Sequence, residues 1–142
     1  MEAAAYETFA RNEREHFWFR GRRALFFDQI RRHVGELGPD AVAFDLGCGV
    51  GGMLEPMAEF GSVQGMDIDP GSLAYCRDRG FPNVFKGFGD HLPLADASVD
   101  LSGAFDVLEH IPEERETIAE CFRVLKPGGW FFQSGPAYQF LY

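Results

Sequence analysis

The beginning of the chain has the spacing of an amphipathic helix. Between residues 8 and 34 the sequence is rich in helix formers, and Phe26, Ile30 and Val34 recur every four positions. Apolar side chains at this spacing form a stripe along one face of a helix. The pattern therefore predicts a single long helix over residues 8–34.

After a segment with Gly and Pro at residues 35–40, the pattern changes to short apolar runs separated by helix-forming stretches. The apolar runs predict strands at residues 41–46, 62–67, 83–87, 98–105 and 130–135. Helices are expected over residues 53–60, 70–79 and 112–125, and residues 126–129 predict a break before the last strand. Strands that alternate with helices form a parallel sheet. We therefore expect an α/β fold with a Rossmann-like, doubly wound, mostly parallel sheet preceded by an N-terminal helix.

We divide the chain into an N-terminal helical cap segment, residues 1–36, and a Rossmann-like core, residues 37–142. A length of 142 residues fits one domain, and a hydrophobic content of 46% supplies the material for a packed core. The three cysteines are odd in number and far apart, and the histidines have no metal-ligand spacing. Neither a disulfide framework nor a bound metal is therefore expected.

Charge is distributed unevenly along the chain. The net charge of −9 divides into +2 for residues 1–33 and −11 for residues 34–142. An acidic core repels phosphate backbones, which argues against a nucleic-acid partner. No apolar run approaches the roughly 18 residues that a membrane span needs, and the charged N-terminus does not have the form of a signal peptide. We therefore expect a cytoplasmic protein that does not insert into membranes.

A glycine-rich turn follows the first predicted strand. Gly47, Gly49 and Gly52 fit the pattern G-x-G-x-x-G between a strand and a helix, which lets the backbone approach a ligand closely. Asp67 lies 20 residues after Gly47, at the end of the second strand, where a carboxylate can accept from both hydroxyls of a ribose. The glycines alone would suit a turn without a ligand equally well. Together with Asp67 they predict a nucleoside-bearing cofactor.

Two carboxylates distinguish S-adenosylmethionine from a dinucleotide in this position. Asp45 stands two residues before Gly47. A carboxylate there would repel a pyrophosphate but attract the ammonium and sulfonium groups of the methionine moiety. Asp90, on the loop after the third strand, can accept a hydrogen bond from an adenine amino group. The segments at residues 107–111 and 125–129 then follow in the expected order.

Here the chain resembles the class I S-adenosylmethionine-dependent methyltransferases, specifically the group of small bacterial enzymes of type 11. The resemblance covers residues 14–137 and rests on five segments in the usual order and spacing, FDLGCGVGG, VQGMDIDP, GDHLPLADASVD, DVLEHI and RVLKPGG. HFWFRGRR, residues 16–23, is also similar to a segment of methyltransferases from polysaccharide or lipid-linked sugar pathways. The resemblance implies methyl transfer to a small-molecule acceptor, with a sugar- or lipid-linked acceptor as one class.

The resemblance also implies a role for each part of the cofactor site. Asp45 and the loop residues Gly47, Cys48 and Gly49 would hold the methionine end of S-adenosylmethionine. Arg20 or Arg23 would meet the carboxylate of the cofactor or of the acceptor.

The other end of the cofactor is assigned to the loops after the second and third strands. Asp67 would bind the ribose and Ile68 would pack against the adenine. Asp90 would accept from the adenine amine, with His91 beside it and Leu92 closing the other face.

Catalysis of methyl transfer depends chiefly on alignment of donor and acceptor. A general base is needed only where the acceptor is a poor nucleophile. His110 follows the fourth strand, near the expected acceptor site, and is the first candidate for that base. Glu109 and Asp106 are weaker candidates. A structural role for His110, pinning the following helix, is an open alternative.

The chain departs from the family at its end, because the family sheet has seven strands and this sequence predicts five. We therefore expect the sheet to be truncated after the fifth strand. The exposed edge, WFFQ at residues 130–133, favours pairing with a second copy in a homodimer. Two other functions stay open: a non-catalytic S-adenosylmethionine-binding module, and a nicotinamide-dependent oxidoreductase that uses the glycine motif.

Overall fold

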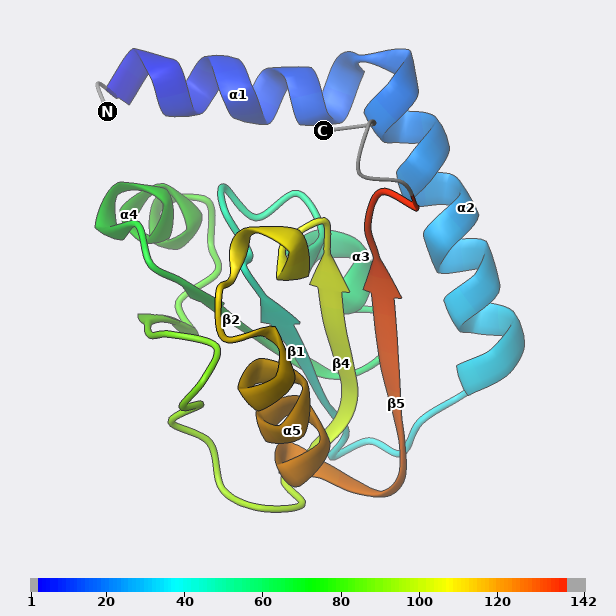
Figure 1. Ribbon diagram of the computed structural model, residues 1–142. Helices are drawn as coiled ribbons and strands as arrows, with labels where there is room; N and C mark the ends of the chain where they lie inside the picture. The colour runs from blue at the N-terminus through cyan, green and yellow to red at the C-terminus, as the bar shows by residue number, and fades with distance from the viewer. Residues whose placement is uncertain (1–2, 138–142) are drawn as a thin grey trace.

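The computed structural model of the protein describes residues 3–137 (Figure 1). Five strands form one sheet, with bounds β1 Val42–Leu46, β2 Ser62–Asp67, β3 Val84–Lys86, β4 Val99–Phe105 and β5 Leu125–Ser134. All neighbouring strands are parallel, in the order β3-β2-β1-β4-β5. The order reverses between β1 and β4, which is the topological switch point of a doubly wound sheet. The predicted Rossmann-like architecture is confirmed.

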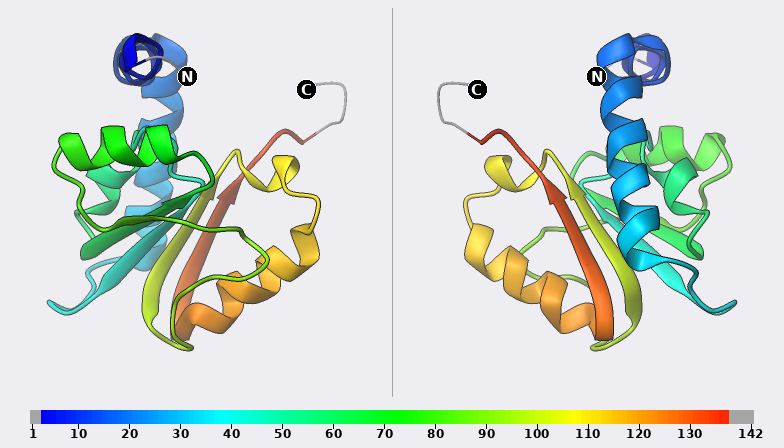
Figure 2. Two further views of the ribbon diagram at one scale, coloured as in Figure 1. Left: turned by 90° about the vertical axis from the view of Figure 1, so that its left-hand side faces the viewer. Right: turned by 90° about the vertical axis from the view of Figure 1, so that its right-hand side faces the viewer.

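Helices cover both faces of this sheet. Their bounds are α1 Ala3–Glu15, α2 Phe17–Val34, α3 Leu54–Met57, α4 Pro70–Asp78 and α5 Glu114–Val124, with a 3-10 helix, η1, at Leu108–His110. Figure 2 shows α2, α3 and α4 on one face of the sheet and α5 on the other. No helix within the described part of the chain is long and apolar enough to cross a membrane.

The predicted single helix over residues 8–34 is wrong, because the chain forms two helices that meet at His16. His16 has extended backbone angles, φ −68° and ψ 131°, and its side chain accepts a hydrogen bond from the Trp18 backbone N–H. A side chain that caps the first free N–H groups of a helix starts a new helix there. As a result α1 runs above the carboxyl ends of the strands, while α2 descends along the sheet (Figure 1).

Alternating residues of the strands supply the two sides of the core. Phe44 and Leu46 of β1 pack on the side covered by α5. Ala43 of β1 packs on the other side with Phe27 and Ile30 of α2. The predicted stripe of α2 is therefore the face that packs on the sheet, with Phe27 as an additional and more deeply buried member. This packing fixes α2 on the sheet, while the boundary between cap segment and core stays a prediction.

The predicted break at residues 126–129 is wrong, because these residues lie within β5. Val99 pairs with Leu125 and Leu101 pairs with Trp130, so β5 advances five residues where β4 advances two. The extra residues form an irregular bulge in which Gly128 has φ +81°. A bulge of this kind lets Lys-Pro-Gly-Gly remain in the strand without continuous pairing.

The outer edge of β5 has no strand beside it among residues 3–137, where β5 pairs only with β4. Trp130 on this strand is 43% exposed and lies near His33 of α2, with 6.3 Å between the ring centroids. An unpaired edge with an apolar face favours association. Pairing of β5 with a second copy stays a prediction.

Candidate functional site

A cleft of about 500 Å³ opens at the carboxyl ends of β1, β2 and β3. Its walls include Gly47 after β1, Asp67 and Ile68 at the end of β2, Asp90 in the following loop and His110 of η1. This volume lies within the range of small-molecule binding sites. The switch point of the sheet therefore brings together residues from most of the predicted motifs.

The glycine loop is fixed by Asp67. Its Oδ2 accepts from the Gly49 backbone N–H at 2.8 Å, and its Oδ1 accepts from the Asp69 N–H at 2.9 Å. Gly47 has φ +73°, and a Cβ atom there would clash with the Val107 side chain. Only glycine combines that backbone conformation with such a close approach. The loop is thus held at the mouth of the cleft by the carboxylate predicted to bind a ribose.

Asp45 lies near the end of β1, beneath the glycine loop, and is 2% exposed. Its Oδ1 is buried and has no hydrogen-bond partner among residues 3–137. Burial raises the pKa of Asp45 well above its ordinary value, and the nearby Cys76, Glu13 and Asp67 raise it further. An unpaired buried carboxylate is costly. This is the arrangement expected of an acid that is paired when a cationic ligand binds, and it therefore fits the methionine end of S-adenosylmethionine.

Cys48 does not present its side chain to the cleft. The side chain is buried and packs with Leu54, Leu73 and Cys76 between α3 and α4. The thiols of Cys48 and Cys76 both donate toward the Gly49 carbonyl oxygen, with S···O distances of 3.9 and 3.3 Å. Only the backbone of Cys48 is therefore placed to contact a ligand in the loop.

The residues predicted for the adenine end are divided between the cleft and the core. Ile68, 61% exposed, and Asp90 lie on the cleft walls. His91 is exposed outside the lining. Leu92 is 2% exposed and packs in the core beside α5, so it does not close the other face of the site. Phe88, 62% exposed, lies on the cleft wall instead.

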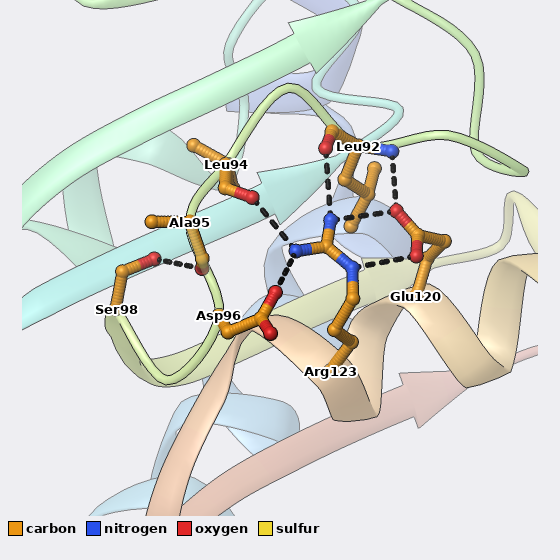
Figure 3. Close-up of polar contacts among 7 residues, drawn as sticks. All are labelled: Leu92, Leu94, Ala95, Asp96, Ser98, Glu120 and Arg123. Carbon is orange, nitrogen blue, oxygen red and sulfur yellow. Dashed lines mark hydrogen bonds and ion pairs between the residues drawn. The ribbon is translucent and has the colours of Figure 1, made fainter.

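Leu92 is held in the core by a polar network shown in Figure 3. Arg123 of α5 donates to the carbonyls of Leu92 and Leu94 at 3.0 and 2.9 Å. It also pairs with Glu120 and Asp96, each at 2.6 Å. Glu120 accepts from the Leu92 N–H at 2.8 Å.

This network sets the ionisation of Glu120. Hydrogen bonds from Arg123 lower the pKa of Glu120 to about 2. Because Arg123 and Glu120 both hold backbone groups of the loop that follows Asp90, the network fixes the path of that loop.

On the side of the cleft where the acceptor is predicted to bind, His110 is exposed and lines the wall. Glu109 has a buried Oε2 with no partner in the described part of the chain. Asp106 is instead committed to structure: it pairs with Arg22 of α2, and its Oδ1 accepts from Ser134 Oγ at 3.2 Å. Its positive φ of 52° is costly for a non-glycine residue and is held by these contacts.

The N-terminal helices add two side chains beside the glycine loop. Arg23 donates to the Gly52 carbonyl oxygen at 3.5 Å, whereas Arg20 is exposed. Of the two predicted arginines, Arg23 is therefore the one that lies beside the loop. Glu13 of α1 lies so close to Gly52 that a Cβ atom on Gly52 would clash with the Glu13 carboxylate.

Sequence reasoning missed Glu13 and Phe88. An acid on a helix carries no signal of its own, and only the bend at His16 brings α1 over the loop. Phe88 could have been found, since it stands two residues before Asp90 in the same loop. No group of three or more His, Cys, Asp or Glu side chains is placed to hold a metal ion within residues 3–137.

Comparison with known proteins places the chain in a family. A family model described as "Methyltransferase domain" matches residues 44–133. A probable S-adenosylmethionine-dependent methyltransferase of Mycolicibacterium smegmatis is 36% identical over 125 residues, which cover 86% of this chain and 46% of the relative. A ubiquinone biosynthesis O-methyltransferase of Bordetella avium is 33% identical over 97 residues, covering 63% of this chain and 40% of the relative. The chain thus spans about half the length of these curated relatives.

Solved structures agree on the fold. The crystal structure of a putative S-adenosyl-L-methionine-dependent methyltransferase from Methanococcus maripaludis superposes with a TM-score of 0.78 at 16% identity. The match covers 94% of this chain and 64% of that one. Family model, relatives and fold confirm the resemblance seen in the motifs. The chain belongs to the class I S-adenosylmethionine-dependent methyltransferase family.

Proposed function

We propose that the chain forms the S-adenosylmethionine-binding part of an enzyme that transfers a methyl group to a small-molecule acceptor. The observation that carries the proposal is the unpartnered, buried carboxylate of Asp45 beneath a glycine loop that Asp67 holds at the switch point. S-adenosylmethionine, when bound, supplies a methyl group activated by its sulfonium. A buried acid at the loop entrance suits that cation and disfavours the pyrophosphate of a dinucleotide.

In this proposal the two ends of the cofactor are held by different kinds of contact. Asp45 and the backbone of Gly47, Cys48 and Gly49 take the methionine end, with Arg23 near its carboxylate. A bidentate arginine is well suited to a carboxylate.

At the other end, the second lone pairs of the Asp67 carboxylate accept from the ribose hydroxyls. Ile68 and Phe88 supply apolar surface for the adenine, and Asp90 accepts from its amino group, with His91 on the adjoining turn. Leu92 supports the loop from the core.

The contribution of the protein to the reaction is chiefly alignment. His110 on the cleft wall is the proposed base, and it would accept the proton of a hydroxyl acceptor as the new bond to oxygen forms. The unpartnered Oε2 of Glu109 is a second acceptor of protons on the same short helix. Asp106 is bound to Arg22 and Ser134 and would act through its hold on α2 and β5.

The acceptor class is inferred from two observations. Several relatives carry the name ubiquinone biosynthesis O-methyltransferase, which favours an oxygen of a small molecule as the acceptor atom. At the start of α2, Phe17 and Trp18 are 78% and 58% exposed, close to arginines of the same helix. An apolar and basic surface of this kind suits an acceptor with a lipid-linked or sugar-phosphate part.

Binding of S-adenosylhomocysteine, measured by calorimetry, tests the proposal. Wild type is compared with Asp67→Ala and with Asp78→Ala, which removes an exposed carboxylate from the end of α4. We expect binding by wild type and Asp78→Ala, and an affinity at least about 30-fold lower for Asp67→Ala, since ribose contacts and the Gly49 support are lost together. Thermal unfolding checks that each variant is folded.

The other functions predict different results. NADH binding without S-adenosylhomocysteine binding would favour the oxidoreductase and reject the proposal. Tight S-adenosylhomocysteine binding without transfer of labelled methyl to a panel of small phenols, amines and sugars would favour the binding module. Label transfer to any of them, reduced in His110→Ala, supports the enzyme and the base.

A further inference from the structure

One face of helix α1 packs against the glycine loop and α4. Tyr6 and Ala10 of this face are buried and pack on Val50 of the glycine loop and on Tyr75 of α4. Glu13 follows at the next helical position of the same face and lies against Gly52. Spacings of four and three residues place these three side chains in one line along the helix. The packing of α1 thus directs the Glu13 carboxylate at the glycine loop.

The Glu13 side chain is partly buried, and one oxygen of its carboxylate is inaccessible to solvent. Its Oε2 is buried and has no hydrogen-bond partner, and no ion pair found within residues 3–137 includes Glu13. Two arginines are near but otherwise engaged. Arg79 donates to the Val50 carbonyl at 2.8 Å, and Arg23 donates to the Gly52 carbonyl at 3.5 Å.

The pKa of Glu13 shows that burial outweighs the charges of the two nearby arginines. Burial raises the pKa, the charges of Arg23 and Arg79 lower it, and the net result is a raised pKa. The charge of Glu13 also acts on Asp45, since it is one of the groups that raise the pKa of Asp45. Two acids from distant parts of the sequence therefore crowd one loop, each with an unpaired buried oxygen.

We propose that Glu13 of α1 is a ligand for the α-ammonium group of the cofactor, so that α1 and Asp45 together enclose the methionine end. This inference rests on the proposed function and adds to it a residue outside the segment that the family model matches. An ammonium group offers three donors, enough to satisfy Asp45 and Glu13 together. Gly52 is required in this arrangement, because any larger residue there would displace the Glu13 carboxylate.

The experiment compares two ligands that differ in the methionine end. S-adenosylhomocysteine carries the ammonium, while 5′-methylthioadenosine has the same nucleoside and lacks the amino-acid group. Calorimetry measures both ligands on wild type, Glu13→Gln and Glu15→Gln, the last being an exposed acid two residues along the same helix. Thermal unfolding of each ligand-free variant is the second readout.

We expect Glu13→Gln to bind S-adenosylhomocysteine about tenfold more weakly, the value of one charge-assisted hydrogen bond. Its affinity for 5′-methylthioadenosine should stay within about twofold of wild type, and Glu15→Gln should match wild type for both ligands. The ligand-free midpoint of Glu13→Gln should equal or exceed that of wild type, since a buried unpaired charge is removed.

Three results separate the possibilities. Unchanged S-adenosylhomocysteine affinity in Glu13→Gln, with binding by wild type, overturns this inference and leaves the proposed function intact. Equal losses for both ligands, or a lowered ligand-free midpoint, would mean that Glu13 only supports the loop, which also overturns it. Absence of binding by folded wild type rejects the proposed function itself.

Discussion

The acids around the two proposed ends of the cofactor site are held in opposite ways. At the proposed methionine end, Asp45 and Glu13 have buried oxygens without partners among residues 3–137, and raised pKa values. At the proposed adenine end, Asp90 is exposed, and Glu120 is paired with Arg123, which lowers the pKa of Glu120 to about 2. At the first end the protein alone does not stabilise the charged form of its acids, which a bound cation would do. At the second end Arg123 stabilises the charge of Glu120, and Asp90 is open to solvent.

This difference indicates which residues contribute to the affinity for the cofactor and which contribute to the stability of the free protein. An unpaired buried charge destabilises the free protein, and binding of its partner offsets that destabilisation. A paired network costs little in the free protein and keeps a loop in place. Substitutions at the methionine end should therefore reduce binding without unfolding the protein, and those behind the adenine end should do the reverse.

At the proposed methionine end, the largest effect on binding is expected for Asp45→Asn, which keeps the side-chain shape and removes the charge. We expect S-adenosylhomocysteine affinity to fall by about 30-fold, about 2 kcal/mol, because a buried ionic hydrogen bond is lost. The ligand-free midpoint should not fall, since the amide avoids the cost of a buried charge. Calorimetry and thermal unfolding measure both. Wild-type affinity, or a binding loss matched by a large loss of stability, would contradict the comparison.

How far the sequence predicts this site depends on whether a residue acts locally. Asp67 and the glycines were predictable, because the strand, turn and helix signals beside them mark where β1 and β2 end, and parallel pairing brings those two ends together. The position of Leu92 was not predictable in this way, because it packs in the core against α5, and because Arg123, 31 residues away, holds its backbone. Glu13 carried no signal, because its role depends on the bend at His16 and on the packing of α1.

The fold shows the same limit. Both faces of β1 could be predicted from apolar runs, since a parallel strand is buried on both sides. The end of α1 could not, because His16 interrupts a stretch in which every neighbouring residue suits a helix. The start of β5 depends on its pairing with Val99 across a bulge, which no local pattern of Lys-Pro-Gly-Gly reveals.

The largest effect on stability is expected for Arg123→Ala. The change removes hydrogen bonds to two loop carbonyls and two ion pairs, and leaves Glu120 without its partner. We expect the free energy of unfolding to fall by about 2–3 kcal/mol. Urea unfolding measures it, with Arg115→Ala, an exposed arginine on the same helix, as the control. A cost equal to that of the control would show that the network does not hold the loop.

The pH dependence of stability should differ in sign between the two ends. A carboxyl whose pKa is lowered by folding stabilises the folded protein at pH values above its ordinary pKa. The contribution of Glu120 to stability is therefore present above pH 4.5 and is lost as the pH falls toward 2. A carboxyl whose pKa is raised by folding has the opposite effect. Glu13 therefore lowers the free energy of unfolding as the pH rises above its ordinary pKa of 4.5. At pH 7 we expect Glu120→Gln to be less stable than wild type and Glu13→Gln to be at least as stable.

Both differences should shrink as the pH is lowered toward 3. Glu120 then takes up a proton in the unfolded chain while it stays ionised in the folded one, which reduces its contribution, and Glu13 is protonated in both states. Urea unfolding of the two variants and wild type at pH 7, 5 and 3 measures the effect. Differences of the same sign for both variants at pH 7 would show that the two ends do not hold their acids in opposite ways.

The smallest effect is expected for Asp90→Asn. An exposed carboxylate exchanges a hydrogen bond with water for one with the adenine amine, so S-adenosylhomocysteine affinity should fall by less than about fivefold. S-inosylhomocysteine, which has a carbonyl in place of the amine, sharpens the test. Wild type should disfavour it, because carboxylate and carbonyl oxygens both accept, while the amide of Asn can donate to the carbonyl. The ratio of the two affinities should therefore move toward the inosyl ligand in Asp90→Asn, and an unchanged ratio would show that Asp90 does not face the adenine amine.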